Sequence, residues 1–492
     1  MSFVGILVGL GVLVWLSYRG WSVLLLAPVA ALIAAAFSGE PLLAHWTVTF
    51  MRAAAGFVAQ YFPLFLLGAI FGKLMDDSGA VLSIAHGMTR WLGPQRALLA
   101  IVLAGALLTY GGVSLFVAFF VLAPMGHALF RTANLPPRLM PAAIALGTST
   151  FTMSALPGSP SIQNAIPMPF FGTTAFAAPG LGVIAAAVMA GFGLWWLSHS
   201  EARARRSSEG YAPPSRAPAS TQDPLLRERG STATHFDPVE IAHGARPVGD
   251  AGEAGDMHQQ PGTLSSLIPL VVVIAVNLMA GLWFLPRANL SYLETVRFGG
   301  LRVEQVAGIW AVLLGLTSGL VALLLLHRSR LADLRSSVDA GANAAVLPVM
   351  SVASLVGFGA VVADLPAFAI VRDWVMNIDA GPLVSLALST NLLAALTGSA
   401  SGGLTIALET LGPAYMAIAQ QIHLDPSLLH RLAVIGAGTL DSLPHNGAVV
   451  SLLAVCGCTH RESYRDIVMV SIVGALLALS IVLVLGTWFG SF

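Results

Sequence analysis

Most of the chain consists of apolar runs that contain no charged residue and are separated by short polar segments. The runs cover 53–72, 97–130, 139–200, 257–286, 305–327, 340–363, 380–408 and 467–492, with shorter ones at 4–17 and 21–37. A charge within hydrocarbon costs several kcal/mol, and about 20 apolar residues in a helix span a bilayer. The pattern therefore predicts an all-α polytopic membrane protein.

The run 139–200 is too long for a single helix and carries six prolines. A helix through Pro157 and Pro160 would lose backbone hydrogen bonds. Broken backbone at membrane depth is tolerated where protein buries it or where it lines a watery cavity. We therefore expect a re-entrant hairpin near 141–172 with its tip near Pro157, followed by a separate span at 177–197.

The two halves of the chain repeat each other at a constant offset of 289 residues. Leu135, Pro137, Leu139, Gly147 and Thr150 match Leu424, Pro426, Leu428, Gly436 and Thr439. An ordered series of matches at one offset indicates an internal repeat, and it predicts a second hairpin near 428–457. Many transporters consist of two such halves of inverted topology, with the substrate site where broken helices meet near the midplane.

Broken segments are expected at corresponding positions in both halves. Thr109–Gly112 and Thr397–Gly403 are candidate breaks inside spans, and Thr150–Asn164 and Thr439–Val449 are candidate hairpin tips. If the repeat is inverted, the two tips enter from opposite faces. Pro157 and Pro444 should then approach each other, and the polar residues of both tips should line one pocket.

Composition narrows the class of protein. Only 10% of the residues are charged, against about 25% in an average soluble domain, and 24 Lys and Arg balance 24 Asp and Glu. These values exclude a soluble globular enzyme, a disordered chain and a nucleic-acid binder. Two cysteines, Cys456 and Cys458, are too few for a disulfide scaffold, and we expect neither a metal nor a cofactor.

Charge placement predicts three parts and an orientation. Residues 198–263 hold 16 of the 48 charged residues in a Pro-, Gly- and Ser-rich stretch, which reads as a disordered polar linker between membrane halves at 1–197 and 264–492. Positive charges favour the cytoplasmic side. Arg19 follows the first span and Arg203 opens the linker, so we expect the N-terminus outside and the linker in the cytoplasm.

Two motifs resemble those of the gluconate permease family, proton symporters of sugar acids and small hydroxy acids within a larger ion-transporter superfamily. They are GTSTFTMSALPGSPSIQN at 147–164 and TLDSLPHNGA at 439–448. The resemblance implies inverted repeats, re-entrant hairpins, a homodimer, an elevator-type movement of a transport domain against a scaffold, and a place in the inner (plasma) membrane. It also implies a small carboxylate substrate.

Small polar and glycine residues at the breaks are the candidate substrate-binding residues. They are Ser154, Gly158, Ser159, Asn164, Ser399, Ser401, Gly402, Ser442, His445 and Asn446. Hydroxyl and amide groups suit the oxygens of a polyol acid, although the same groups also satisfy backbone atoms that the breaks free. No Lys or Arg lies in 139–200 or 380–430, so an anion would depend on helix N-termini and hydroxyls. Arg431 could contribute but reads more simply as an interfacial residue.

Three ionisable residues are candidates for proton coupling: Asp441, His445 and Glu409. An ionisable group within the membrane is costly and is a functional candidate by default, and an ordinary histidine titrates near physiological pH. Glu409 could instead cap or pair near a helix end, and His445 could hydrogen-bond the tip.

The function expected from these features is proton-coupled symport of a small organic anion such as gluconate. A transporter or channel for a different solute or ion is the alternative. An intramembrane serine protease using Ser401 and His445 ranks last, because a Ser–His pair needs further elements of a triad or its motif.

Overall fold

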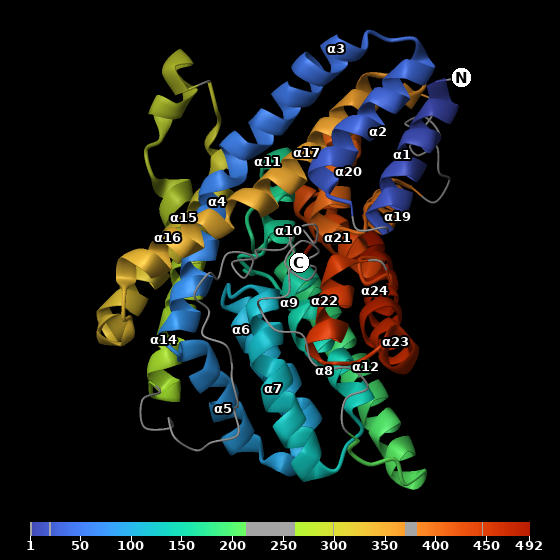
Figure 1. The fold of residues 1–492 in the computed structure, drawn as a ribbon. Helices are drawn as coiled ribbons and strands as arrows, with labels where there is room; N and C mark the ends of the chain where they lie inside the picture. Colours follow the sequence, from blue (N-terminus) through green and yellow to red (C-terminus); the bar gives the residue numbers. More distant parts are fainter. Residues whose placement is uncertain (1, 19–20, 213–260, 299, 370–380, 445) are drawn as a thin grey trace.

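The computed structural model describes residues 2–18, 21–212, 261–298, 300–369, 381–444 and 446–492, and these residues form a helical molecule (Figure 1). The α-helices of the N-terminal half are α1 (Ser2–Tyr18), α2 (Val23–Ser38), α3 (Leu42–Ala44), α4 (Met51–Asp77), α5 (Ala80–Leu92), α6 (Ala97–Tyr110), α7 (Leu115–Ala133), α8 (Met140–Thr148), α9 (Phe151–Ser154), α10 (Ile162–Ala165), α11 (Pro167–Phe171) and α12 (Pro179–Arg206). Those of the C-terminal half are α14 (Thr263–Met279), α15 (Val303–His327), α16 (Leu334–Ala344), α17 (Val346–Asp364), α19 (Pro382–Thr397), α20 (Ala400–Gln421), α21 (Pro426–Thr439), α22 (Gly447–Val455), α23 (His460–Ile467) and α24 (Gly474–Phe489).

Short π- and 3₁₀-helical stretches join these helices. They are η1 (His45–Phe50), η2 (Pro94–Arg96), η3 (Pro137–Leu139), η5 (Ala280–Phe284), η6 (Leu285–Arg287), η7 (Ser291–Glu294), η8 (Val296–Phe298), η9 (Arg328–Arg330) and η10 (Val468–Val473).

Six continuous helical stretches of the described chain are long and apolar enough to cross a membrane. They are Leu42–Asp77, Pro179–Arg206, Thr263–Arg287, Val303–Arg330, Leu334–Asp364 and His460–Phe489. Each stretch contains or overlaps one of the apolar runs of the sequence. A helix of that length needs a continuous apolar surface, which is either buried in the protein or exposed to lipid. The prediction of an α-helical, multi-pass membrane protein is confirmed.

Helices α6 and α7 form an antiparallel pair whose turn lies at 111–114. Gly105 of α6 packs against Leu122 of α7, and Gly126 of α7 packs against Ile101 of α6, so the two helices run in opposite directions. Gly112 in the turn has φ +96°, a conformation that glycine adopts without a Cβ penalty. The sequence predicted a break at this place, and the break reverses the chain.

Helices α19 and α20 form a second antiparallel pair, with its turn at Gly398 and Ser399. A Cβ on Gly403 would lie 2.2 Å from the backbone nitrogen of Ala394, so only glycine permits this close approach. Farther from the turn, the Ser385 and Tyr415 hydroxyls lie 2.7 Å apart and hold the two helices together. In chain order, this pair precedes α21 and α22, as α6 and α7 precede α8 to α11.

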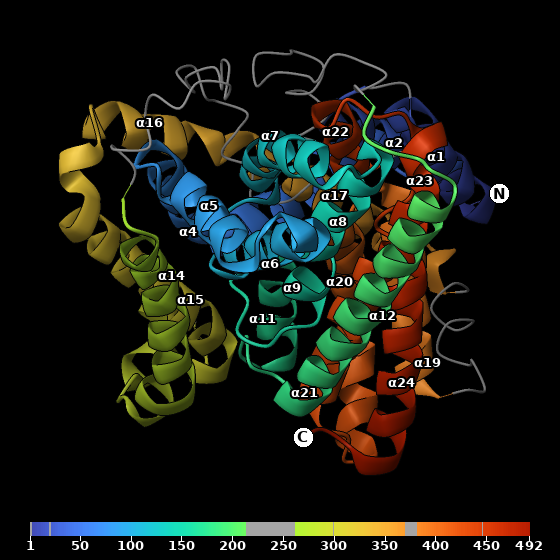
Figure 2. The same cartoon turned by 90° about the horizontal axis from the view of Figure 1, so that it is seen from below.

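The predicted hairpins near 141–172 and 428–457 are corrected by the structure. Helix α8 packs against α6, α7 and α23, whereas α11 packs against α15, α20 and α21. Helix α21 likewise packs against α19 and α24, whereas α22 packs against α7 and α8. Both segments thus continue through the molecule instead of doubling back, and Figure 2 shows them running in opposite directions. Pro and Gly break the hydrogen-bond ladder in a hairpin and in an interrupted helix alike, so the sequence does not distinguish the two.

Helix α12 continues to Arg206, nine residues beyond the span expected to end at 197. The chain after it remains attached to the fold, because the backbone N–H of Tyr211 donates to Asn134 Oδ1 at 2.9 Å. The central part of the expected linker, 213–260, lies outside the described residues. The first part of the expected linker, up to residue 212, therefore belongs to the N-terminal half.

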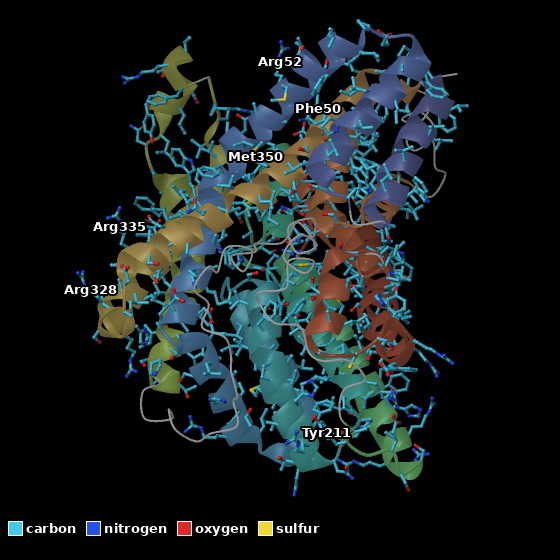
Figure 3. All side chains as sticks on the ribbon, in the orientation of Figure 1. Phe50, Arg52, Tyr211, Arg328, Arg335 and Met350 are labelled. Atoms are coloured by element: carbon cyan, nitrogen blue, oxygen red, sulfur yellow. The ribbon has the colours of Figure 1, made fainter. Side chains whose placement is uncertain are left out.

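Helices α4, α14, α15 and α16 form one side of the molecule, α17 crosses from this side toward α2 and α20, and α12 and α24 lie on the other side (Figures 1 and 2). The exposed Arg328 and Arg335 project from the edge near α16 (Figure 3). Figure 2 shows α16 on the same side of the molecule as the C-terminal end of α12, which carries Arg203. The helix ends that carry Arg203 and Arg328 thus lie on the same face.

Candidate functional site

The turn between α6 and α7 lies directly against the interruption between α9 and α10. The Tyr110 hydroxyl donates to the Pro157 carbonyl oxygen at 2.7 Å. Gly112 packs against the Pro160 ring, where a Cβ would lie 3.3 Å from Pro160 Cγ. Residues 155–161, which we call break 1, are thereby held between the tip of the first helix pair and the rest of the fold.

A small cavity of about 40 Å³ lies where the first tip meets break 1. Its lining comes from α4, α6, the 111–114 turn, α7, α8, α9, break 1, α10 and α15. The residues are Gly68, Thr109, Gly112, Val113, Ser114, Leu115, Thr148, Thr152, Met153, Ser159, Pro160, Ser161, Ile162, Gln163 and Leu316. These side chains include hydroxyls and an amide but no charged group, and the space suffices for only a few water molecules. The lining therefore suits the oxygens of a small polar solute, and the cavity is too closed in this conformation to hold a sugar acid.

The second tip lies against residues 440–444 and Asn446, which we call break 2. Asp441 is buried, and its Oδ1 accepts hydrogen bonds from the backbone N–H of Ala400 and from Asn446 Nδ2, both at 2.8 Å. Asn446 Nδ2 also donates to the Gly398 carbonyl at 2.9 Å. At the same tip, Ser399 caps α20 by accepting from Gly402 N–H at 3.0 Å. A carboxylate of the chain itself therefore occupies the N-terminal end of α20.

The predicted residues of the first half divide between cavity and support. Ser159 lines the cavity, whereas the Ser154 hydroxyl donates to the Thr150 carbonyl at 3.0 Å. Asn164 is buried and donates to the Ser159 and Ala175 carbonyls at 2.9 and 3.0 Å. Gly158 has φ +81°, and its backbone N–H donates to the same Ala175 carbonyl at 2.8 Å. Asn164 and Gly158 are thus engaged in holding break 1, and the Ser154 hydroxyl is engaged beside it.

The predicted residues of the second half gather at the other tip. Ser399, Ser401, Gly402, Asp441, Ser442 and Asn446 are all buried there. None of them lines the cavity described above, so this cavity is not the single pocket expected from both tips. His445 lies outside the described residues, and Glu409 is exposed on α20.

Sequence reasoning missed several residues at the first tip. Thr109, Ser114, Thr152 and Gln163 line the cavity. Their signal was present, since Thr109 borders the predicted break and Thr152 and Gln163 lie in the quoted 147–164 motif. Arg431 was interpreted as interfacial, but its side chain is completely buried.

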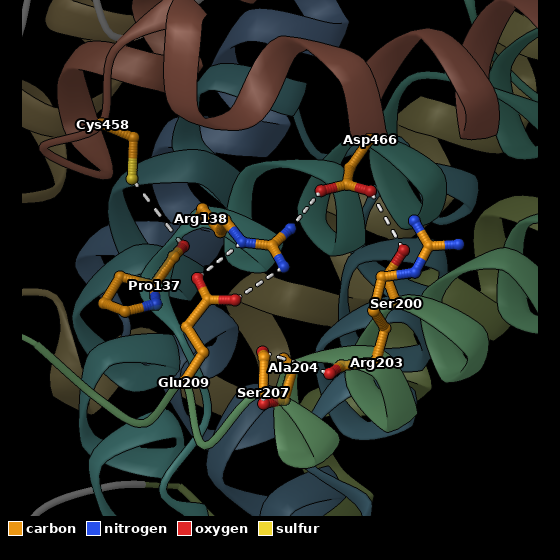
Figure 4. A network of polar contacts seen from close by, with 9 residues as sticks. All are labelled: Pro137, Arg138, Ser200, Arg203, Ala204, Ser207, Glu209, Cys458 and Asp466. Atoms are coloured by element: carbon orange, nitrogen blue, oxygen red, sulfur yellow. Dashed lines mark hydrogen bonds and ion pairs between the residues drawn. The ribbon is translucent and has the colours of Figure 1, made fainter.

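A polar network joins the outer ends of the two interrupted segments (Figure 4). Arg138, just before α8, forms ion pairs with Glu209 at 2.8 Å and with Asp466 of α23 at 2.9 Å. Asp466 also accepts from Trp196 Nε1 and the Ser200 hydroxyl of α12. The hydrogen bond from Arg138 lowers the pKa of the Glu209 carboxyl below its ordinary value. The network fixes the ends of α8, α12 and α23 relative to one another.

An all-helical chain with membrane-spanning helices and interrupted segments around a polar cavity is a membrane transporter in class, and its relatives agree. A family model described as GntP family permease matches residues 1–190. An uncharacterized transporter of Bacillus subtilis, YxjC, is 39% identical over 479 residues, which cover 96% of each chain. The high-affinity gluconate transporter of Escherichia coli is 34% identical over 104 residues, which cover 20% of this chain and 23% of the relative. The chain belongs to the GntP family of permeases and is a transporter, not an enzyme.

Proposed function

We propose that the protein is a secondary active transporter that carries a small organic carboxylate together with protons. The observation that carries this proposal is the cavity at the first tip, whose lining combines hydroxyl and amide groups, among them those of Ser114, Ser159 and Gln163, with no acidic side chain. Such a lining favours an anionic, oxygen-rich solute, because hydroxyl and amide donors stabilise carboxylate oxygens. The partial relationship to a gluconate transporter supports sugar acids and small hydroxy acids as the substrate class.

We also propose that the two halves form an inverted repeat. Each half contains an antiparallel helix pair, an interrupted segment and a long final helix, and the interrupted segments run in opposite directions (Figure 2). The helix pairs α6–α7 and α19–α20 are the re-entrant hairpins of this proposal. The side formed by α4 and α14–α16 is the scaffold, against which the rest moves in an elevator-like manner within a homodimer.

Proton coupling is assigned to Asp441, with Glu409 and His445 as the other candidates. Asp441 is buried where the second tip meets break 2, so its protonation state bears directly on how tightly the tip is held. Glu409 is exposed on α20. The protein is proposed to lie in the inner (plasma) membrane, with the linker in the cytoplasm and the N-terminus outside.

Uptake by proteoliposomes tests the proposal. A panel of labelled carboxylates that includes gluconate, glycerate and 3-hydroxybutyrate is offered across an acid-outside pH gradient. Accumulation that collapses with a protonophore supports proton symport. Absence of uptake for every carboxylate would contradict the substrate class, and uptake without stimulation by unlabelled substrate on the far side would indicate a channel.

A further inference from the structure

Arg431 is a buried cation without an acidic partner in the described part of the chain. It lies on α21 and is the largest of the fully buried side chains. Its Nε and Nη2 donate to the Ala177 carbonyl at 3.1 and 2.7 Å, and Nη1 donates to the Ala155 carbonyl at 3.2 Å. A further contact of 3.4 Å joins Nη2 to the Ala175 carbonyl. All of its partners are backbone oxygens in break 1 or shortly after α11.

A buried guanidinium held by neutral groups keeps its full positive charge. Carbonyl dipoles offset part of the cost of removing the charge from water, but they leave the surrounding potential positive. A carboxylate partner would have cancelled that potential. Ala155, whose carbonyl accepts from Arg431, lies in the chain between the cavity-lining residues Met153 and Ser159. The positive charge can therefore influence the cavity without forming part of its lining.

Three further carbonyl groups of break 1 also accept hydrogen bonds from side chains. The Pro157 oxygen accepts from Tyr110, and the Gly158 oxygen accepts from Asn277 Nδ2 of α14 at 3.2 Å. The Ser159 oxygen accepts from Asn164 Nδ2. Interrupted helices in transporters often use such carbonyls to bind a cation. Here the carbonyl oxygens of residues 155, 157, 158 and 159 are already engaged by side-chain donors, which leaves fewer of them for a cation and favours an anion.

We propose that Arg431 is a positioning residue that sets the charge preference of the cavity. It does not line the cavity. It orients the Ala155, Ala175 and Ala177 carbonyls toward itself and supplies the positive potential that favours an anion over a neutral solute of the same shape. This inference rests on the proposed transport of a carboxylate. It supplies a cation near segments 139–200 and 380–430, which contain no Lys or Arg.

The experiment compares an anion with its uncharged counterpart. Wild-type proteoliposomes are loaded for counterflow of the labelled acid that they accumulate, and uptake is competed with the unlabelled acid and with its amide (gluconate and gluconamide for the leading candidate). The inhibition constant of the amide divided by that of the acid measures the preference for the anion. Arg431→Gln and the apolar Arg431→Met should each lower this ratio about tenfold, the effect expected of losing one nearby charge inside a protein.

Three matched variants separate charge from structure. Arg431→Lys keeps the charge but loses the planar fork, so the ratio should stay within about twofold of wild type while thermal stability falls. Tyr110→Phe removes an uncharged donor to break 1 and should weaken both competitors equally. Arg335→Gln removes an exposed charge from α16 and should change neither constant. If either the glutamine or the methionine variant is folded, the experiment remains decisive.

The outcomes are distinguishable. An unchanged ratio in folded Arg431→Gln or Arg431→Met, with carboxylate uptake intact in wild type, overturns the role of Arg431 and leaves the proposed function standing. An equal loss for the acid and the amide also overturns it and assigns Arg431 a purely structural role. Absence of carboxylate uptake in wild type overturns the proposed function and this inference together.

Discussion

The Asp441 carboxylate accepts a hydrogen bond of 2.8 Å from the backbone N–H of Ala400, the first residue of α20, 41 positions earlier in the chain. This contact joins break 2 to the tip of the α19–α20 pair. A charged acceptor at a helix N-terminus is stabilised by the positive end of the helix dipole. Protonation of Asp441 would remove that charge and weaken the hold on the tip.

Substitution of Asp441 by Asn should separate transport from proton coupling. The amide oxygen can still accept from Ala400, but the side chain no longer exchanges a proton. We expect uphill, acid-driven accumulation to be abolished while counterflow of substrate remains measurable. Loss of the charge-assisted bond should also lower stability by about 1–2 kcal/mol, which thermal unfolding in detergent would measure.

Glu409→Gln provides the matched comparison for Asp441→Asn. If Asp441 carries the proton, acid-driven accumulation by Glu409→Gln should stay close to wild type, because Asp441 and not Glu409 connects break 2 to the tip of the α19–α20 pair. The opposite pattern, with accumulation intact in Asp441→Asn and lost in Glu409→Gln, would move the coupling site to α20.

Ser159→Ala should raise the KM for the carboxylate about tenfold, which corresponds to one lost hydrogen bond to a charged group. Within the described chain, the Ser159 hydroxyl accepts a long contact of 3.4 Å from Ser161 N–H and donates none, so its proton is available to a substrate. Initial uptake rates over a range of concentrations would measure the change. Ser154→Ala is the control, because the Ser154 hydroxyl already donates to Thr150. Equal effects of the two substitutions would contradict this assignment of roles.

The linker should be replaceable only beyond residue 212. Exchanging 213–256 for about 20 Gly and Ser residues, a chain with a typical reach of about 25 Å, should leave uptake largely intact. Extending the exchange back to residue 207 removes Glu209 and Tyr211 with their contacts to Arg138 and Asn134, and it should lower thermal stability. Size-exclusion profiles and melting curves of the two proteins would check the difference. Full loss of transport in the shorter exchange, despite normal expression and insertion, would assign the linker a role in transport.

The network around Arg138 predicts a pH-dependent contribution to stability. The pKa of Glu209 is lowered in the folded state, so its contribution is present above the ordinary carboxyl pKa and is lost as the pH falls through the lowered value. Because Glu209 is well exposed, Glu209→Gln should cost less than about 1 kcal/mol at pH 7 and less still at pH 3, below the ordinary carboxyl pKa. Asp466→Asn, which affects a buried acceptor for Arg138, Trp196 and Ser200, should cost about 3 kcal/mol at pH 7. Thermal unfolding at both pH values measures these effects, and a pH-independent effect of Glu209→Gln would argue against the ion pair.

The sequence by itself determined the class of protein and the positions where its helices are interrupted. Charge-free runs identify membrane helices because a charge in hydrocarbon is costly, and Pro157, Pro160 and Gly112 identify breaks because they remove hydrogen bonds or require a special backbone conformation. These are local or one-dimensional constraints, so they can be read without knowing which helices are neighbours. The matched order of residues such as Pro137 and Pro426 similarly indicated two corresponding halves.

Only the tertiary structure decided which breaks reverse the chain and what surrounds them. The 111–114 turn reverses because α7 packs back on α6, whereas break 1 continues because α8 and α11 pack against different helices. Arg431 shows the same limit. Its place in the sequence suggested a membrane interface, but carbonyl groups 254 and 276 positions earlier make its burial possible. Packing between distant segments supplies these partners, and no local pattern encodes them.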